Sequence, residues 1–177
     1  AIAIKLDSAG PVIFKQKRLG RGKACFYMYK FRTMRVNTPK NIPTHLFANS
    51  EIYITRVGGF LRRYSLDELP QLFNILKGEM SIIGPRPALW NQIDLIMERD
   101  KYNANDVLPG LTGWAQINGR DTISIKDKAK FDGIYVKQMG FWMDIKCFIG
   151  TIVIVLKSRD VLEGGTSQFR KGTTIEK

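Results

Sequence analysis

Clusters of glycine and proline divide this chain into short segments that turns or loops must separate. The clearest clusters are Gly10-Pro11, Gly84-Pro85-Arg86-Pro87 and Pro109-Gly110-Leu111-Thr112-Gly113. Because proline removes a backbone donor and restricts the residue before it, the cluster at residues 84–87 predicts a rigid, non-helical turn. A length of 177 residues fits one domain with a hydrophobic core and leaves little room for two.

Between these breaks, the hydrophobic pattern predicts two strands and four helices. The strands are residues 12–14 and 25–31, joined through the basic loop 17–23 as a β-hairpin. Apolar residues recur at helical spacing in four later stretches, which are residues 65–76, 89–97, 126–139 and 144–157. We therefore expect an α+β fold, a mostly helical single domain over residues 1–177 with a short N-terminal hairpin. The polar tail after about residue 164 is expected to be loosely ordered.

Positive charge is concentrated in the first third of the chain. The formal net charge is +12, from 28 Lys+Arg and 16 Asp+Glu. The first 66 residues hold 13 basic and 2 acidic residues, so they carry +11 of that charge. Such a field favours a polyanionic partner, which can be a nucleic acid, anionic lipid headgroups or a phosphate-bearing substrate.

Cysteine, histidine and apolar runs each narrow the range of functions. Cys25 and Cys147 are single and far apart, which argues against a disulfide framework or a cysteine metal site. His45 is the sole histidine, so a histidine-based triad is not expected. No apolar run reaches the roughly 18 residues of a spanning helix. The longest candidate, residues 147–156, is either a buried element or a segment that lies in a membrane interface, edged by Phe141 and Trp142.

Two adjacent carboxylates, Asp67 and Glu68, are the first candidates for chemistry. Ser65 followed by Glu68 matches a capping box, and acidic residues in a first helical turn favour the helix dipole. Taken alone, the pattern favours capping over catalysis by roughly two to one. In a catalytic site, one carboxylate could bind a divalent cation while the other attacks phosphorus.

Candidate phosphate-binding cations accompany these carboxylates. Lys30 and Arg32 alternate along a predicted strand, whereas Arg86 and Arg120 lie in the glycine- and proline-rich contexts GPRP and NGR. A guanidinium held in a rigid loop can bind two phosphate oxygens and neutralise a transferring phosphoryl group. Each of these residues alone could equally be a solvated surface charge.

Several longer runs together resemble one family, the bacterial sugar transferases, which are monotopic phosphoglycosyl transferases. The runs, in the family's order, are KLDSAGPVIFKQKRLG (5–20), YKFRTM (29–34), ITRVGGFLRRYSLDELPQLFNILKGEMSIIGPRP (54–87), PGLTGWAQINGR (109–120) and, more weakly, FWMDIK (141–146). The family usually begins with a hydrophobic re-entrant membrane helix, of which only the last residues could be present here. Ala9 stands where proline is common in the family.

The resemblance implies a mechanism and a location. Asp67 would be the nucleophile that attacks a UDP-sugar, releases UMP and holds the phospho-sugar until undecaprenyl (polyprenyl) phosphate accepts it. Glu68 would bind or position Mg²⁺, the implied cofactor. Lys30, Arg86 and Arg120 would contact phosphates, and Asp144 would be a further site residue. The enzyme would act at the cytoplasmic face of the bacterial inner membrane, in capsule, exopolysaccharide or related glycan synthesis, with amphipathic helices in the interface and an anionic membrane surface as a partner.

Two alternatives come from other functional classes. The hairpin interleaves basic residues with aromatic ones, as nucleic-acid stacking platforms require, at Phe14, Phe26, Tyr27, Tyr29 and Phe31. No RNP, KH or helix-turn-helix pattern accompanies it, so no nucleic-acid partner is expected. A non-catalytic membrane-surface scaffold would explain the basic N-terminal region equally well, but it would have no use for the arrangement of SLDELPQ and GPRP.

Overall fold

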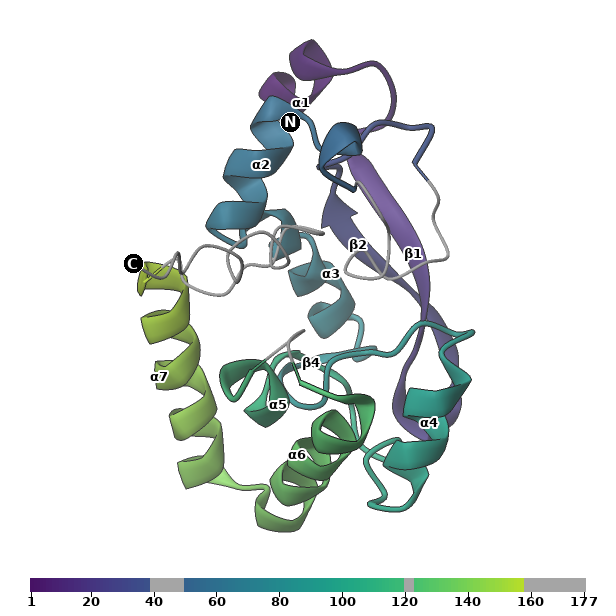
Figure 1. The fold of residues 1–177 in the computed structure, drawn as a ribbon, viewed down its shortest axis with the longest axis vertical. Helices are drawn as coiled ribbons and strands as arrows, with labels where there is room; N and C mark the ends of the chain where they lie inside the picture. The colour runs from purple at the N-terminus through teal and green to yellow at the C-terminus, as the bar shows by residue number, and fades with distance from the viewer. Residues whose placement is uncertain (39–49, 120–122, 158–177) are drawn as a thin grey trace, which may run out of the picture.

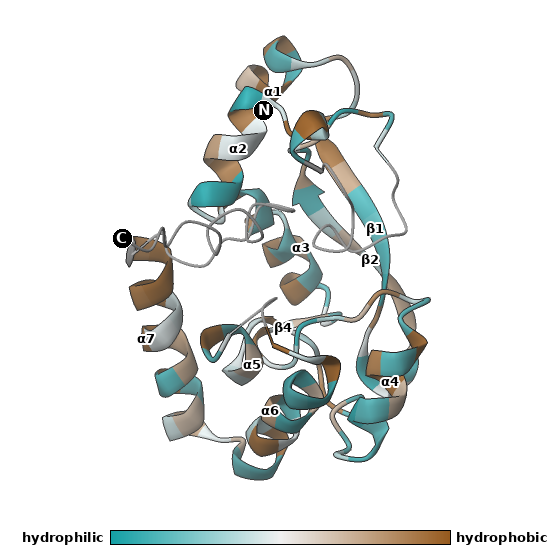
Figure 2. Cartoon of the chain, viewed as in Figure 1, coloured by the Kyte–Doolittle hydropathy of each residue, from teal (hydrophilic) through white to brown (hydrophobic). Residues whose placement is uncertain are grey.

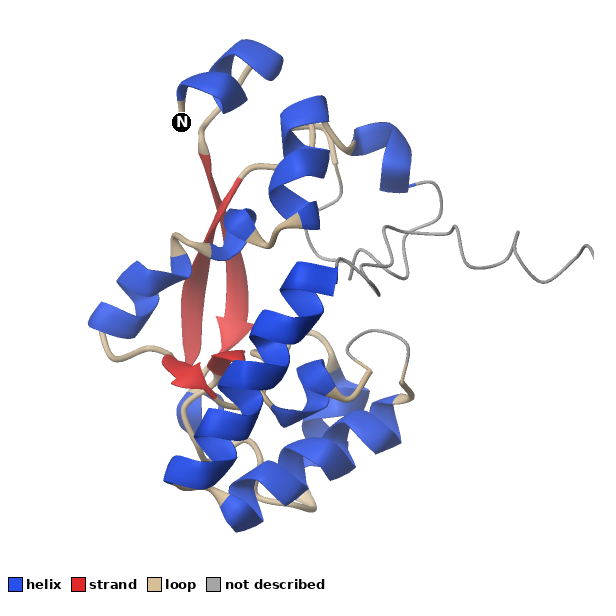
Figure 3. Cartoon of the chain, turned by 90° about the vertical axis from the view of Figure 1, so that its left-hand side faces the viewer, coloured by secondary structure: helices blue, strands red, loops and turns tan. Residues whose placement is uncertain are grey.

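The computed structural model describes residues 1–38, 50–119 and 123–157 as helices, strands and connecting loops. The α-helices are α1 (Ile2–Asp7), α2 (Arg56–Arg63), α3 (Gln71–Leu76), α4 (Ile93–Asp100), α5 (Trp114–Ile117), α6 (Ile125–Gln138) and α7 (Phe141–Lys157). Short 3₁₀ turns are η1 (Arg21–Lys23), η3 (Ser50–Tyr53) and η4 (Leu66–Glu68), and the strands are β1 (Ile13–Leu19), β2 (Cys25–Phe31), β3 (Ser81–Ile83) and β4 (Gly110–Thr112). The predicted α+β class is confirmed (Figures 1 and 3). The predicted loose tail lies outside the described residues.

The N-terminal hairpin exists, but its first strand is longer than predicted. β1 and β2 pair antiparallel from Ile13 opposite Phe31 to Leu19 opposite Cys25. Residues 17–19, expected in the basic loop, therefore belong to β1, because charged side chains are tolerated on the exposed face of a two-stranded sheet. Phe26 lies in the core with Met28, so it is no stacking platform for a nucleic acid.

Two of the predicted helices are found close to their expected bounds, and one begins later. α6 and α7 match the expected helices 126–139 and 144–157 within one to three residues. The helix expected from residue 89 begins instead at Ile93, because Leu89 pairs with Arg18 of β1 and is buried. α2 was not predicted, since its two glycines weaken the helical pattern; Thr55 caps it by accepting a hydrogen bond from the Gly58 amide at 3.0 Å.

Three glycines lock the proline-rich turn of residues 84–87 against a second loop. β3 and β4 form a short parallel pair, which the sequence pattern did not predict. The Gly84 amide donates to Thr112 O at 2.8 Å, and the Gly110 amide donates to Pro85 O at 2.9 Å. A Cβ on Gly110 would lie 2.1 Å from Gly84 N, and one on Gly113 would lie 2.1 Å from Gly84 O. Only glycine allows the two backbones to approach this closely.

Helices gather around this junction and leave large apolar faces uncovered. α6 packs against α4 and α5, and Arg99 of α4 donates to Asp132 of α6 at 2.8 Å in a fully buried pair. The C-terminal half of α7 is strongly hydrophobic (Figure 2), yet Phe148, Ile149 and Leu156 are exposed. In the described part of the chain, no helix is both long and apolar enough to cross a bilayer.

The glycine junction makes a testable prediction. Gly110→Ala should destabilise the fold by about 1–3 kcal/mol or more, because the added methyl group overlaps backbone atoms that cannot move aside. Gly140→Ala is the matched control, since a Cβ at Gly140 meets no atom within 4 Å. Urea unfolding of both variants measures the difference, and equal stability of the two would contradict this account of the junction.

Candidate active site

The turn that carries Asp67 and Glu68 begins at a strained residue. Ser65 has a left-handed backbone with φ of 55°, and its side chain makes no capping hydrogen bond. The capping-box reading is therefore wrong for this chain, and the predicted helix start becomes the 3₁₀ turn η4 followed by α3. Left-handed conformations of non-glycine residues cost free energy and are typical of functional sites.

Residues 66–76 form a helical run whose polar side faces inward. Asp67, Glu68, Gln71 and Asn74 are all buried, and the last two have no exposed surface. Four apolar residues of the same run, which are Leu69, Leu72, Phe73 and Leu76, are 47–83% exposed, whereas Ile75 packs against the core cluster of Phe26, Met28 and Met80. Surface helices of soluble proteins usually show the opposite arrangement, so this run buries polar side chains and leaves an apolar face exposed.

Asn74 fixes this run against the free edge of β2. Its side chain accepts a hydrogen bond from the Tyr29 amide at 3.0 Å and donates to Tyr27 O at 2.8 Å. It also donates to the Glu79 carboxylate at 2.7 Å. A single amide thus satisfies the edge of the strand and sets the distance between the strand and the carboxylate turn.

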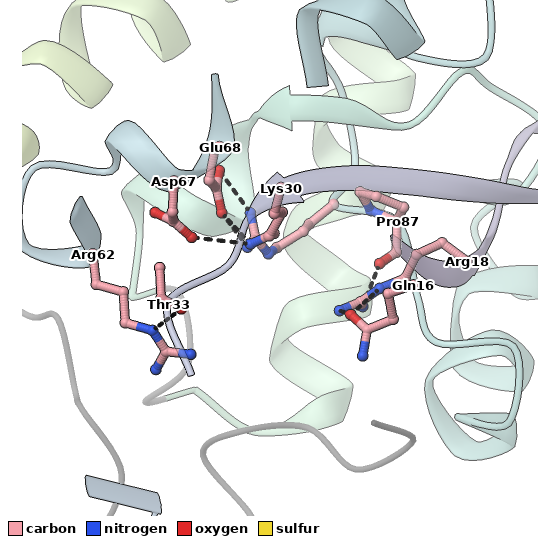
Figure 4. Close-up of polar contacts among 9 residues, drawn as sticks. Gln16, Arg18, Lys30, Thr33, Arg62, Asp67, Glu68 and Pro87 are labelled. Atoms are coloured by element: carbon pink, nitrogen blue, oxygen red, sulfur yellow. Dashed lines mark hydrogen bonds and ion pairs between the residues drawn. The ribbon is translucent and has the colours of Figure 1, made fainter. Parts of the chain in front are cut away.

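Glu68 is shared between two cations from distant segments. Lys30 Nζ of β2 lies 2.8 Å from Glu68 Oε1, and Arg86 Nη2 of the proline-rich turn lies 2.6 Å from the same oxygen. Arg86 Nη1 is 3.4 Å from Glu68 Oε2. Figure 4 shows both carboxylates pointing toward Lys30. The structure therefore brings together four of the predicted site residues: Lys30, Asp67, Glu68 and Arg86.

Asp67 is less well neutralised than its neighbour. Its Oδ2 lies 3.8 Å from Lys30 Nζ, and no described residue donates a hydrogen bond to it. Burial raises the pKa of the Asp67 carboxyl above its usual range, and the Glu68 charge adds to this rise. Burial likewise lowers the pKa of Lys30, which the neighbouring carboxylates partly offset. Asp67 is thus a desolvated carboxylate within a positively charged surrounding.

Two arginines that the sequence reading did not single out support the site. The guanidinium of Arg62, at the end of α2, lowers the pKa of Asp67 electrostatically, and its Nε donates to Thr33 Oγ1 at 2.8 Å. Arg18 Nη1 donates to Pro87 O at 2.9 Å, which ties the proline-rich turn to β1 (Figure 4). The basic excess of the N-terminal segment was the available signal, but it did not distinguish these residues from surface charges.

The other predicted site residues lie elsewhere or outside the described residues. The buried Arg32 donates to backbone carbonyls at the end of α1, those of Ala9, Ser8 (2.6 Å) and Ile4 (3.3 Å), so its guanidinium holds α1 in place rather than joining the carboxylates. Asp144 accepts a hydrogen bond from Tyr135 at 2.9 Å, which joins α7 to α6. Arg120 lies outside the described residues.

Asp67 and Glu68 could supply only some of the ligands that a small divalent cation needs. In the described segments, no three His, Cys, Asp or Glu residues are grouped to hold a metal. Mg²⁺ is usually held by one or two carboxylates together with water and substrate phosphates, so Asp67 and Glu68 fit that donor set. Both Glu68 oxygens contact cations here, so these cations must shift if Glu68 is to become a ligand.

Comparison with known proteins identifies the family of this chain. Residues 1–158 match the family model described as bacterial sugar transferase. A UDP-glucose:undecaprenyl-phosphate glucose-1-phosphate transferase from Xanthomonas campestris pv. campestris is 42% identical over 163 residues, which cover 88% of this chain and 34% of that protein. An undecaprenyl-phosphate galactose phosphotransferase from Salmonella typhimurium is 37% identical over 84% of this chain and 34% of its own length.

A third relative is similar in size to this chain. The uncharacterized sugar transferase EpsL of Bacillus subtilis is 40% identical over 158 residues, which cover 89% of this chain and 76% of that protein. The chain spans only about a third of the length of the other two relatives. The match over residues 1–158 covers the whole candidate site, and the chain belongs to the bacterial sugar transferase family.

Proposed function

We propose that this chain transfers a sugar-1-phosphate from a UDP-sugar to undecaprenyl phosphate and releases UMP. The names of its relatives support this donor and this acceptor. We place the reaction at the first membrane step of capsule, exopolysaccharide or related glycan synthesis. The observation that carries the proposal is a buried carboxylate without its own hydrogen-bond donor, Asp67, beside a carboxylate that two phosphate-binding cations hold.

The unequal neutralisation of the two carboxylates assigns their roles. Glu68 is fixed by Lys30 and Arg86, whereas Asp67 keeps its lone pairs free of hydrogen bonds from the described residues. A desolvated anion near cations is a better nucleophile than a solvated one, so Asp67 is the attacking group. An ionised carboxylate needs no general base, which agrees with the presence of one histidine in the whole chain.

The reaction proceeds in two displacements at one phosphorus atom. An Asp67 oxygen attacks the β-phosphorus of the UDP-sugar, and the bond from that phosphorus to the bridging oxygen breaks. UMP leaves with the bridging oxygen and its electron pair. An oxygen of undecaprenyl phosphate then attacks the same phosphorus, which breaks the bond to Asp67 and restores the carboxylate. The product is an undecaprenyl diphosphate sugar.

Lys30 and Arg86 supply charge for the phosphates of the donor. Both reach the carboxylates from rigid elements, a strand and a glycine-locked turn, so only their side chains need to turn from Glu68 to the phosphates. Bound Mg²⁺ would reduce the repulsion between the anionic nucleophile and the diphosphate. Glu68, with Asp67 beside it, is the residue that would hold the ion.

The exposed apolar faces support an interfacial location. Leu72, Phe73 and Leu76 are exposed on α3, which follows the turn that carries Asp67, so inserting them into lipid would bring the nucleophile toward the headgroups. Anionic headgroups would attract the basic N-terminal segment. We therefore propose that the domain rests on the cytoplasmic face of the bacterial inner membrane, where a soluble nucleotide sugar meets a lipid phosphate.

Replacing the nucleophile tests the mechanism. Asp67→Asn in the full-length enzyme should reduce UMP release from a panel of UDP-sugars with undecaprenyl phosphate by at least about a thousandfold, because the covalent route is lost. Incubation of the wild-type enzyme with donor but without acceptor should give a phospho-sugar adduct by intact mass spectrometry. Turnover by the folded variant near the wild-type rate would refute the assignment.

The same substitution should stabilise the protein. Burial raises the Asp67 pKa in the folded state, so stability falls as pH rises between the ordinary carboxyl pKa and the raised value. The cost is absent well below the ordinary carboxyl pKa, where both states are protonated, and it grows as pH rises above that value, where the unfolded state ionises first. Thermal unfolding of Asp67→Asn should therefore show a higher Tm at neutral pH, by roughly 2–4 °C per kcal/mol relieved.

Glu68→Gln is the matched variant for that stability measurement. It removes the anion between Lys30 and Arg86, so it should lower stability by about 1–3 kcal/mol at neutral pH. A Tm that falls for Asp67→Asn as it does for Glu68→Gln would show that Asp67 is a structural ion-pair partner.

Membrane contact can be tested on the outer side of α3. The double variant Leu72→Gln, Leu76→Gln should keep its Tm, since both side chains are exposed, but bind vesicles with anionic lipids roughly 10–100-fold more weakly. Ile93→Gln is the control, because Ile93 is comparably exposed and belongs to α4, which lies apart from α3 (Figure 1). Unchanged vesicle binding by the double variant would exclude α3 from the interface.

A further inference from the structure

The guanidinium of Arg18, on β1, joins a side chain of its own strand to the backbone of the proline-rich turn. Its Nε and Nη2 donate to Gln16 Oε1 at 3.1 Å and 2.6 Å, and its Nη1 donates to Pro87 O at 2.9 Å (Figure 4). Two N–H groups on one oxygen hold the planar guanidinium in one orientation. Gln16 therefore aims Arg18 at the carbonyl that follows Arg86.

Backbone contacts already hold the segment after Arg86 against β1. The Leu19 amide donates to Ala88 O at 3.0 Å, and Leu89 forms an isolated antiparallel bridge with Arg18. The glycine junction fixes the turn on its other side, before Arg86. The Arg18 side chain is thus not needed merely to join the two segments, and its contact adds control at the carbonyl between these two anchors.

The carbonyl of Pro87 is well placed to control Arg86. Proline fixes its own φ, so an oriented Pro87 carbonyl also orients the peptide unit that joins Arg86 to Pro87. The Cα–Cβ bond of Arg86 then starts from a fixed backbone. Its side chain keeps 26% exposed surface, so a ligand phosphate can reach the guanidinium.

The same hairpin also carries the second cation of the site. Lys30 of β2 lies directly opposite Phe14 of β1, so its side chain projects from the same face of the hairpin as Phe14 and Arg18. Lys30 and Arg86 meet at one atom, Glu68 Oε1, at 2.8 Å and 2.6 Å. One strand pair therefore carries one of these cations and holds the backbone that carries the other.

We propose that Gln16 and Arg18 are positioning residues that set the Arg86 guanidinium at the separation from Lys30 that the donor diphosphate requires. This role rests on the proposed function. Neither residue touches the phosphorus or the sugar, because both act through the backbone of residues 86–87. Without this pair, the turn keeps its two anchors but Arg86 samples more orientations, and ordering it again weakens diphosphate binding.

A double-mutant cycle between Arg18 and Arg86 tests this role. The ligand is UDP with Mg²⁺, which carries the diphosphate of the donor, and calorimetry on the full-length enzyme measures the affinity. Arg18→Met should bind UDP roughly tenfold more weakly than the wild type, because Arg86 is no longer ordered before binding. In an Arg86→Met background the same substitution should cost less than about twofold, since the side chain that it positions is already absent.

Two further variants separate orientation from charge. Gln16→Met keeps every charge but removes the oxygen that orients Arg18, so it should weaken UDP binding several-fold, and this loss should also vanish in the Arg86→Met background. Lys17→Met removes the same charge as Arg18→Met from the same strand. Lys17 projects from the opposite face, with its Nζ 5.4 Å from the centre of the Trp90 ring, so its loss should leave UDP binding within about twofold of the wild type.

Each other result overturns the role. Wild-type affinity in Arg18→Met, or the same loss with and without the Arg86 substitution, would show that Arg18 does not act through Arg86. An equal loss in Lys17→Met would assign the effect to net charge. If Arg18→Met does not fold, the cycle of Gln16→Met with Arg86→Met decides by the same criteria, and failure of both variants to fold would show that the pair is a structural contact.

The wild-type enzyme separates this role from the proposed function. If it binds no UDP, the proposed function fails and the role of Arg18 fails with it. If it binds UDP but the cycle shows no coupling, only the role of Gln16 and Arg18 is removed.

Discussion

The contact of one carboxylate with two cations holds the site together. Glu68 joins a strand through Lys30 and a proline-rich turn through Arg86, so segments 38 and 18 residues away in the chain meet at one oxygen atom. Each of these segments has its own anchor: Asn74 fixes the strand edge, and the glycine contacts of β3 and β4 fix the turn. Asp67 is consequently presented among cations, and its ion pair with Lys30, at 3.8 Å, is longer than the two that hold Glu68.

Residues 66–76 bury polar side chains and expose apolar ones, so the candidate active site and the exposed apolar surface share one segment. Polar side chains of this run point inward, toward Lys30, Arg86 and the β2 edge, so four of its apolar residues are left exposed. Covering this apolar face with lipid would contribute a favourable free energy of burial. A helix of a soluble protein obtains that free energy by packing on the protein core. The turn proposed to be catalytic and the exposed apolar surface are therefore two sides of one short segment.

Several residues of this site lower the stability of the folded state. Ser65 has a left-handed backbone, Asp67 is desolvated, and Gln71 buries an unpaired amide. Groups of this kind are tolerated when the surrounding fold over-determines the geometry, as the buried Arg99–Asp132 pair and the glycine junction do here. These costs fall within seven residues of sequence, Ser65 to Gln71, which is the segment that acts on the donor in the proposed reaction.

The sequence by itself determined the α+β class, the hairpin, the helices α6 and α7, the family, and four members of the cluster: Lys30, Asp67, Glu68 and Arg86. These follow from local periodicity and from motifs, which are properties of neighbouring residues. Tertiary structure decided which arginines serve the site, since Arg32 holds α1 whereas Arg62 lies near Asp67. It also decided that Ser65 does not cap, and that two loops meet as β3 and β4. Such outcomes depend on contacts between segments far apart in the chain, which no local pattern encodes.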